Sequence, residues 1–67
     1  MRFERIDKLL VDPIEAGALE IALSDTFGGS IEVEDKGSYF EVDIKKYGLD
    51  ERMVVSFLEQ DRYRIVR

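Results

Sequence analysis

The sequence predicts a small α+β domain, built on a central antiparallel β-hairpin that two helices pack against. Three observations carry this prediction. Apolar and polar residues alternate over about residues 30–45, a helix start signal opens an apolar stretch at about 13–25, and an amphipathic stretch follows at about 49–59. A second alternating stretch at 61–67 predicts a terminal strand. At 67 residues, the chain has the length of a single small domain, residues 1–67.

The hairpin is the central prediction because its period, turn and composition agree. Apolar residues alternate with acidic residues on both sides of Asp35-Lys36-Gly37-Ser38, which is the period of a half-buried strand. Gly37 adopts positive φ at no steric cost, so these four residues supply the turn. Closing the chain there predicts three cross-strand pairs: Val33 with Phe40, Ile31 with Val42, and Glu32 with Glu41.

The polar side chains of the hairpin share one face of the predicted sheet. These candidate partner-binding residues are Glu32, Glu34, Tyr39, Glu41 and Asp43. Like charges directly across a strand pair are destabilising. The acidic face is therefore either a solvated surface or a docking face for a basic patch on a protein partner, and the sequence leaves both interpretations open.

Residues 2–11 carry an ambiguous pattern. Phe3, Ile6 and Leu10 recur at spacings of three and four, which favours a short amphipathic helix. A β-strand over residues 2–8 would instead complete a βαββαβ order, which is the order of ferredoxin-like folds. We prefer the helix on periodicity, and the strand remains the alternative.

The first helix is predicted from its start signal. Asp12-Pro13-Ile14-Glu15 places Asp at the N-cap, Pro at the first helical position and Glu at the third, a variant capping box. The apolar residues of this helix cover about half of its circumference: Ile14, Ala18, Leu19, Ile21, Ala22 and Leu23. This arc is wider than one sheet face requires, so either residues 2–11 or a partner should cover the remainder. Gly17 inside the helix suggests a close approach of another backbone.

Asp50 and Glu51 begin the second predicted helix, because acidic residues in a first turn suit the helix dipole. Three apolar residues share one face of this helix, Leu49, Met53 and Phe57, and Val54 and Leu58 flank them. The β-branched pair Val54-Val55 lowers the helix propensity, so a strand through 52–58 is the alternative. In the terminal strand, arginines discourage pairing at the sheet edge.

The sequence contains no histidine and no cysteine. The commonest general base, the usual metal ligands and every Ser–His or Cys–His nucleophile pair are therefore missing, and we expect no enzyme activity, no catalytic residue and no cofactor. The hairpin carboxylates form no Asp-x-Asp-x-Asp-Gly loop, and side chains on a flat strand face converge poorly on one ion. We therefore expect no metal site.

The formal net charge of −5 is unevenly distributed. Residues 12–43 carry nine acidic residues against one lysine, which argues against a nucleic-acid partner, since phosphate contacts need clustered Lys and Arg. Five arginines lie toward the two ends and would form a small basic patch if the termini meet: Arg2, Arg5, Arg62, Arg64 and Arg67. No apolar run reaches membrane-spanning length and residues 1–5 are too polar for a secretory signal, so we expect a cytoplasmic protein without membrane contact.

Three motifs resemble one known family. Val33-Glu34-Asp35-Lys36-Gly37-Ser38-Tyr39-Phe40-Glu41-Val42 resembles the VEDRGAYVRI hairpin of the effector, or coupling, proteins of bacterial diiron monooxygenases, the toluene, phenol and methane hydroxylase family. Asp12-Pro13-Ile14-Glu15-Ala16-Gly17 is similar to the GPIxxAG entry to that family's first helix, and Leu49-Asp50-Glu51-Arg52-Met53-Val54 with Leu58 to its LTRxTLEExLG helix. The resemblance covers about residues 12–60 and is truncated, because the closing strands of the family's C-terminal half have no counterpart.

The resemblance implies a cofactor-free regulatory protein that binds a hydroxylase and alters substrate access and reactivity at its diiron centre. It implies no catalytic residues. The alternative is a small α+β protein-interaction module, of a kind carried by phages or plasmids, that forms a homodimer through a sheet edge or the first helix, or that inhibits a partner. A ligand- or cation-binding domain is a third class.

Overall fold

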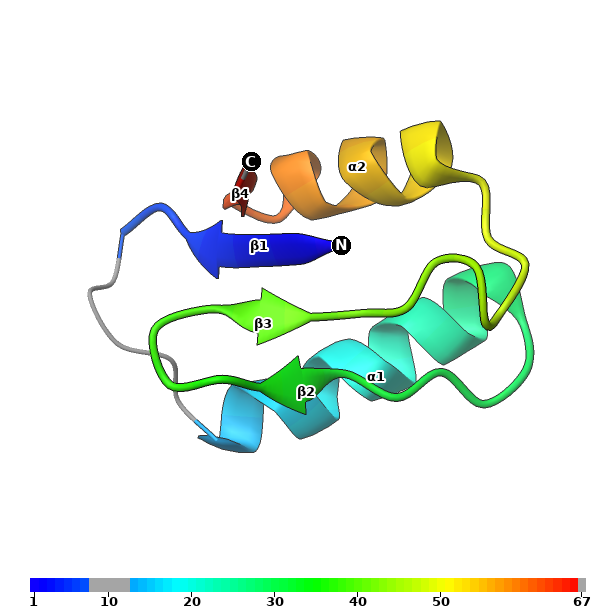
Figure 1. The fold of residues 1–67 in the computed structure, drawn as a ribbon, viewed down its shortest axis with the longest axis horizontal. Coiled ribbons are helices and arrows are strands. Elements are labelled where there is room, and N and C mark those ends of the chain that lie inside the picture. Colours follow the sequence, from blue (N-terminus) through cyan, green and yellow to red (C-terminus); the bar gives the residue numbers. More distant parts are fainter. Residues whose placement is uncertain (8–12, 67) are drawn as a thin grey trace.

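The structure, a computed structural model, describes residues 1–7 and 13–66. Its elements are β1 (Arg2–Arg5), α1 (Pro13–Phe27), β2 (Glu34–Asp35), β3 (Phe40–Glu41), α2 (Glu51–Gln60) and β4 (Tyr63–Val66). The four strands form one sheet in the order β2-β3-β1-β4, and each neighbouring pair is antiparallel (Figure 1). The predicted α+β class is confirmed. A βαββαβ chain with this strand order has the ferredoxin-like topology.

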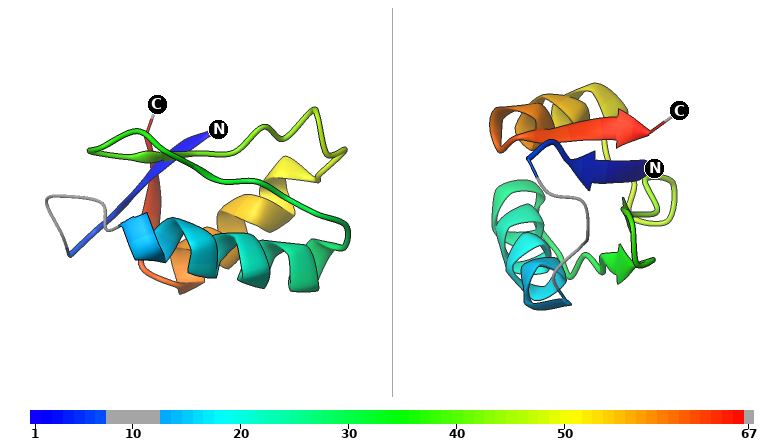
Figure 2. Two further views of the ribbon diagram at one scale, coloured as in Figure 1. Left: turned by 90° about the horizontal axis from the view of Figure 1, so that it is seen from below. Right: turned by 90° about the vertical axis from the view of Figure 1, so that its left-hand side faces the viewer.

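Both helices pack on one face of the sheet, and no described helix covers the opposite face (Figure 2). Phe3, Phe40 and Tyr63 come from three different strands and meet Leu23 of α1 and Leu58 of α2 in the core, where each is at most 1% exposed. The three aromatic rings are tilted or edge-to-face, with centroids 5.5 to 6.0 Å apart. The core therefore lies between the sheet and the helices.

Residues 2–5 form the strand β1, so the preferred helix is wrong here. β1 pairs with β3 on one side and with β4 on the other, and it lies in the middle of the sheet. Phe3 is buried, whereas Ile6, which helical spacing groups with Phe3, is 59% exposed. Strand pairing on both sides outweighs a periodicity carried by only three residues. Leu10 lies outside the described residues.

The hairpin is present, but its register differs from the prediction by two residues. Glu34 faces Glu41 and Asp35 faces Phe40. Three predicted pairs are therefore wrong: Val33–Phe40, Ile31–Val42 and Glu32–Glu41. The ladder is also short, and most of the predicted strand region 30–45 lies outside it. A shift of two residues leaves every side chain on its predicted face, because strand side chains alternate with a period of two.

The turn explains the shift in register. The loop consists of Gly37 and Ser38, and it is closed by the backbone N–H of Lys36, which donates to the carbonyl of Tyr39 at 2.9 Å. Gly37 has φ +94°, and it alone of the two loop residues has positive φ. The predicted loop over Lys36 and Gly37 matches a type I′ turn only with positive φ at both residues, which is unfavourable for lysine. Moving the loop by one residue confines positive φ to glycine.

α1 runs from Pro13 to Phe27, two residues beyond the predicted end near 25. Three of its apolar residues are buried against the sheet: Ala16, Leu19 and Leu23. Ile14 and Ile21 remain 82% and 66% exposed, so part of the wide apolar arc faces outward. Apart from the adjoining residues and the backbone of α1 itself, no described atom lies within 4 Å of the place where a Cβ on Gly17 would be, so the expected close approach of another backbone is not found. Asp12, the predicted N-cap, lies outside the described residues.

α2 is a helix, so the alternative strand over 52–58 is wrong. Asp50 caps it, and its carboxylate accepts hydrogen bonds from two backbone N–H groups of the first turn at 3.0 and 3.3 Å. Val54 and Leu58 form the buried face, whereas Met53, which helical spacing groups with Leu49 and Phe57, is 59% exposed. The predicted terminal strand is present as β4 and starts two residues later than expected.

Candidate functional site

The open face, which is the face of the sheet opposite the helices, carries the candidate partner-binding residues. These are Glu32, Glu34, Tyr39, Glu41 and Asp43. The four acidic members line one shallow hollow together with Met1, Lys46 and Tyr47. Tyr39 joins the same surface, because the guanidinium of Arg2 lies 5.4 Å from its ring centroid and also bonds Glu41. The structure thus brings the predicted set together.

The like-charged pair across the hairpin is compensated within the chain. Glu34 faces Glu41 directly. Lys36 Nζ lies 2.7 Å from the carboxylate of Glu34, and Arg2 Nε donates to Glu41 at 3.1 Å. The hydrogen bond and the positive charge of Lys36 lower the pKa of Glu34 below its usual value of 4.5. The repulsion between Glu34 and Glu41 is therefore reduced within the chain, by Arg2 of the neighbouring strand β1 and by Lys36 of the turn.

The basic ends of the chain are also ion-paired with acidic neighbours. Because β1 and β4 are adjacent, Arg64 Nε donates to Glu4 across the two strands at 2.6 Å. Three of the five terminal arginines have carboxylate partners: Arg2, Arg5 and Arg64. These three form no uncompensated basic patch. Arg62 is exposed, and Arg67 lies outside the described residues.

The hollow on the open face combines both signs of charge. The Met1 ammonium donates to the carbonyl of Val42 at 2.7 Å, and Asp43 accepts the backbone N–H of Lys46 at 3.0 Å. Within the described part of the chain, the carboxylates of Glu32 and Asp43 have no ion-pair partner. These two groups can accept the cationic side chain of another protein. No cluster of three or more acidic residues with metal-binding geometry is found among the described residues.

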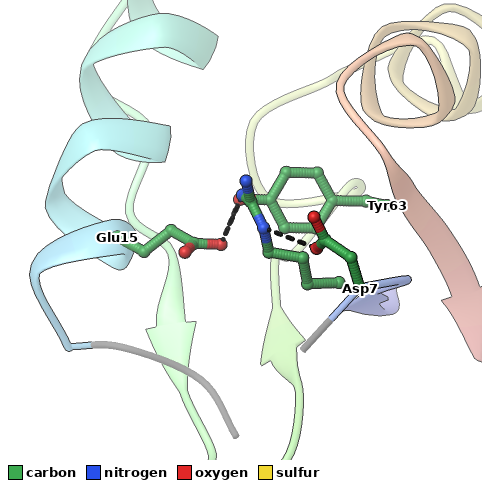
Figure 3. A network of polar contacts seen from close by, with 4 residues as sticks. Asp7, Glu15 and Tyr63 are labelled. Carbon is green, nitrogen blue, oxygen red and sulfur yellow. Dashed lines mark hydrogen bonds and ion pairs between the residues drawn. The ribbon is translucent and has the colours of Figure 1, made fainter. Parts of the chain in front are cut away.

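A second polar cluster lies between α1 and the sheet, and sequence reasoning did not identify it (Figure 3). We call Arg5, Asp7, Glu15 and Tyr63 the Tyr63 clamp. Arg5 donates to Asp7 and to Glu15, at 3.0 Å in each case, and to the hydroxyl oxygen of Tyr63 at 3.1 Å. The Tyr63 hydroxyl in turn donates to Glu15. The clamp joins the first turn of α1 to β1 and β4.

The electrostatics of the Tyr63 clamp favour a structural role. Burial, together with the hydrogen bond to Glu15, raises the pKa of Tyr63 above its usual value of 10.0. The hydrogen bond to Tyr63 and the charge of Glu15 raise the pKa of Arg5. The phenol and the guanidinium both keep their protons at neutral pH, so neither acts as a base or nucleophile. Tyr63 lies 48 and 58 positions from its two partners, and no local sequence signal marks such a cluster.

No family model, curated protein or solved structure matches this chain. Nothing in these comparisons bears on the resemblance to the effector proteins, which stays a prediction. Within residues 1–7 and 13–66, no helix has the length and apolar character needed to cross a membrane.

Proposed function

We propose that this protein is a non-catalytic regulatory or coupling protein that acts by binding a larger protein through the open face. One observation carries the proposal: all five candidate residues lie on one sheet face that no described helix covers. The named candidate partner is the hydroxylase of a multicomponent diiron monooxygenase, on the resemblance of the hairpin and helix motifs. Binding would modulate the activity of that enzyme.

The charges of the open face support recognition of a complementary surface. Glu34 and Glu41 are already paired within the chain, which leaves Glu32 and Asp43 for intermolecular contacts. A partner that presents Lys or Arg to these two carboxylates gains attraction without breaking an ion pair of the sheet. A partner with acidic groups there is repelled. Complementarity of this kind determines the choice of partner and the association rate more than the total affinity.

The test is a charge reversal at Glu32, which is exposed and has no ion pair among the described residues. Purified Glu32→Arg protein should bind a purified diiron hydroxylase about tenfold more weakly than the native chain in isothermal titration calorimetry. Glu59→Arg on α2 is the matched control and should bind normally. Equal dissociation constants for the native and Glu32→Arg proteins, both folded by circular dichroism, would exclude the open face as the binding surface.

A second candidate function is a protein-interaction module that forms homo-oligomers through α1. The observation that favours it is the outward apolar side of α1, where Ile21 is 66% exposed and Gly17 has open space around it. Light scattering of the native protein should then give a molar mass greater than that of the monomer. The Ile21→Glu variant should have the mass of a monomer. Met53→Glu is the control, since Met53 is similarly exposed on α2. A monomeric native protein would refute this candidate.

A further inference from the structure

The two edges of the sheet differ in whether their outward backbone groups are bonded. β2 forms one edge and β4 the other. In an antiparallel ladder, alternate residues direct N–H and C=O toward the neighbouring strand, and the residues between them direct these groups outward. Exposed edges of this type are templates for another strand. The outward groups of the two edges therefore decide whether a partner strand can add.

The extended segment that leads into β2 is closed at its outer edge by side chains of α1, which bond its outward N–H groups. The backbone groups of Glu34 and Lys36 face β3. The odd-numbered residues of this segment therefore direct their N–H and C=O groups away from the sheet. The outward N–H of Val33 donates to Glu20 Oε2 at 2.8 Å. The N–H of Ile31, the next outward group along the extended segment, donates to Ser24 Oγ at 2.9 Å. A strand arriving at this edge would have to displace both bonds.

The β4 edge is open. Ile6 N–H donates to the carbonyl of Arg62 at 3.0 Å, so the even-numbered residues of β4 face β1. Tyr63 and Ile65 then direct their N–H and C=O groups away from β1. No strand or side chain within residues 1–7 and 13–66 bonds these outward groups.

The charge of β4 selects the class of segment that would pair there. Arg62 is exposed, and the side chain of Arg64 is 66% exposed while using only one of its five N–H donors for Glu4. No acidic residue lies between positions 62 and 66. A second copy adding its own β4 would bring Arg64 and the preceding Arg62 of both copies to one edge, and their repulsion disfavours a homodimer there. A segment with acidic residues at alternate positions would instead place a carboxylate beside each arginine.

We propose that the outer edge of β4 accepts an extended acidic segment of a partner protein as a fifth strand. The outward groups of Tyr63 and Ile65 supply the main-chain hydrogen bonds, and Arg62 and Arg64 select the acidic side chains. The alternate side chains of the segment are apolar and lie beside the half-buried Ile65. This edge is separate from the hollow around Glu32, so the inference does not depend on the proposed function.

The experiment titrates the native chain with an end-capped Thr-Glu-Val-Glu-Val-Thr peptide and follows backbone amides by nuclear magnetic resonance. In the free protein, the Ile65 amide should exchange with solvent about tenfold faster than that of Val66, which is bonded to β1. At saturating peptide, exchange at Ile65 should slow by about tenfold. A capped peptide with Lys in place of both Glu residues should leave exchange at Ile65 unchanged. Equal protection by both peptides, or none by either, would overturn the proposal.

Two charge reversals give the matched variants. Arg62→Glu should weaken binding of the acidic peptide by about fivefold or more, because an exposed attraction becomes a repulsion. Arg52→Glu makes the same charge change on α2 and should leave the affinity unchanged within about twofold. Equal losses in both variants, or a loss in neither, would contradict the assignment to β4. Glu32→Arg should bind the peptide normally, so loss of hydroxylase binding and loss of peptide binding report on different surfaces.

Discussion

The two halves of the chain follow the same plan and differ in how their edge strands are protected. The first half is β1, α1 and β2, and the second is β3, α2 and β4. Leu19 and Leu23 in α1, and Val54 and Leu58 in α2, have the same spacing and are buried in one core. In α1, a polar residue follows each of these two leucines. These residues are Glu20 and Ser24, and their side chains accept hydrogen bonds from the backbone of the segment leading into β2. In α2 the matching residues are Val55 and Glu59, and neither bonds β4.

Burial of a helix and protection of the neighbouring sheet edge are therefore separate properties. The apolar spacing places a helix on the sheet, and it is satisfied in both halves. The side chain one position further around the helix decides whether the backbone of the edge strand is covered. In the first half it is covered, and in the second it is open to a partner.

The two helices also differ in the residue that adopts the left-handed conformation after the helix ends. α1 is followed by Gly28 with φ +85°, which suits a residue without a Cβ. After α2 the left-handed position is taken by Arg62, with φ +66°, where a side chain is unfavourable. The second half thus keeps an arginine at the start of its open edge strand at a cost in backbone energy.

The largest expected effect comes from breaking the Tyr63 clamp, which ties the first turn of α1 to β1 of its own half and to β4 of the second half. Glu15→Ala leaves the buried Tyr63 hydroxyl and the Arg5 guanidinium without their shared acceptor, and it should lower the free energy of unfolding by about 2–3 kcal/mol. Glu51→Ala removes the first-turn acidic residue of α2 and should cost only about 0.5 kcal/mol. Urea denaturation measures both, and equal losses would contradict a clamp specific to α1.

A smaller effect is expected from opening the closed edge. Glu20→Ala leaves the part-buried N–H of Val33 without an acceptor and should destabilise the protein by about 1–2 kcal/mol. It should also promote association between molecules, because β2 then resembles β4 as an exposed edge without the arginines. Urea denaturation and light scattering report the two consequences. Glu59→Ala is the control in α2, and Glu20→Gln, which keeps an acceptor oxygen, should recover most of the stability.

The helix ends should respond in opposite directions. Arg62→Gly relieves the left-handed backbone and should raise the free energy of unfolding by about 0.5 kcal/mol, after the entropy of glycine in the unfolded chain is subtracted. Gly28→Ala introduces a Cβ at positive φ and should lower it by about 1 kcal/mol. Thermal unfolding gives both signs, and a shift in the same direction for the two variants would refute the comparison.

The smallest expected effect concerns the pH response of the closed edge. The pKa of Glu34 is lowered by Lys36, so the folded state binds fewer protons than the unfolded state near pH 4. The contribution of this pair to stability is therefore present at neutral pH and is lost as the pH falls below 4.5 through the folded-state pKa. A side-chain carboxyl titration by nuclear magnetic resonance should place the midpoint of Glu34 below 4.5, and Lys36→Gln should raise it. An unchanged midpoint in the variant would show that Lys36 is not the cause.

The candidate face could be predicted although the register could not. Side-chain parity along Glu32, Glu34 and Glu41 is a local property, so an error of two residues in pairing left all of them on the open face. The compensation of their charges could not be predicted. Arg2 reaches Glu41 across 39 positions of sequence, and only the placement of β1 beside β3 brings the two together.

The sequence could not show that β1 is a strand, again because the deciding contacts come from distant parts of the chain. Its four residues carry a weak pattern that fits either a helix or a strand. Pairing with β3 and β4 on both sides settles the choice, and both strands lie far from β1 in the sequence, at Phe40–Glu41 and at Tyr63–Val66.

By itself, the sequence determined the α+β class, the existence of both helices and of the hairpin, and the face on which each hairpin side chain lies. These follow from periods, turns and caps that span a few neighbouring residues. The tertiary structure alone decided the strand order, the register, the Tyr63 clamp and which sheet edge is closed. The physical reason is that each of these depends on hydrogen bonds and ion pairs between groups brought together from separate elements, which no local pattern records.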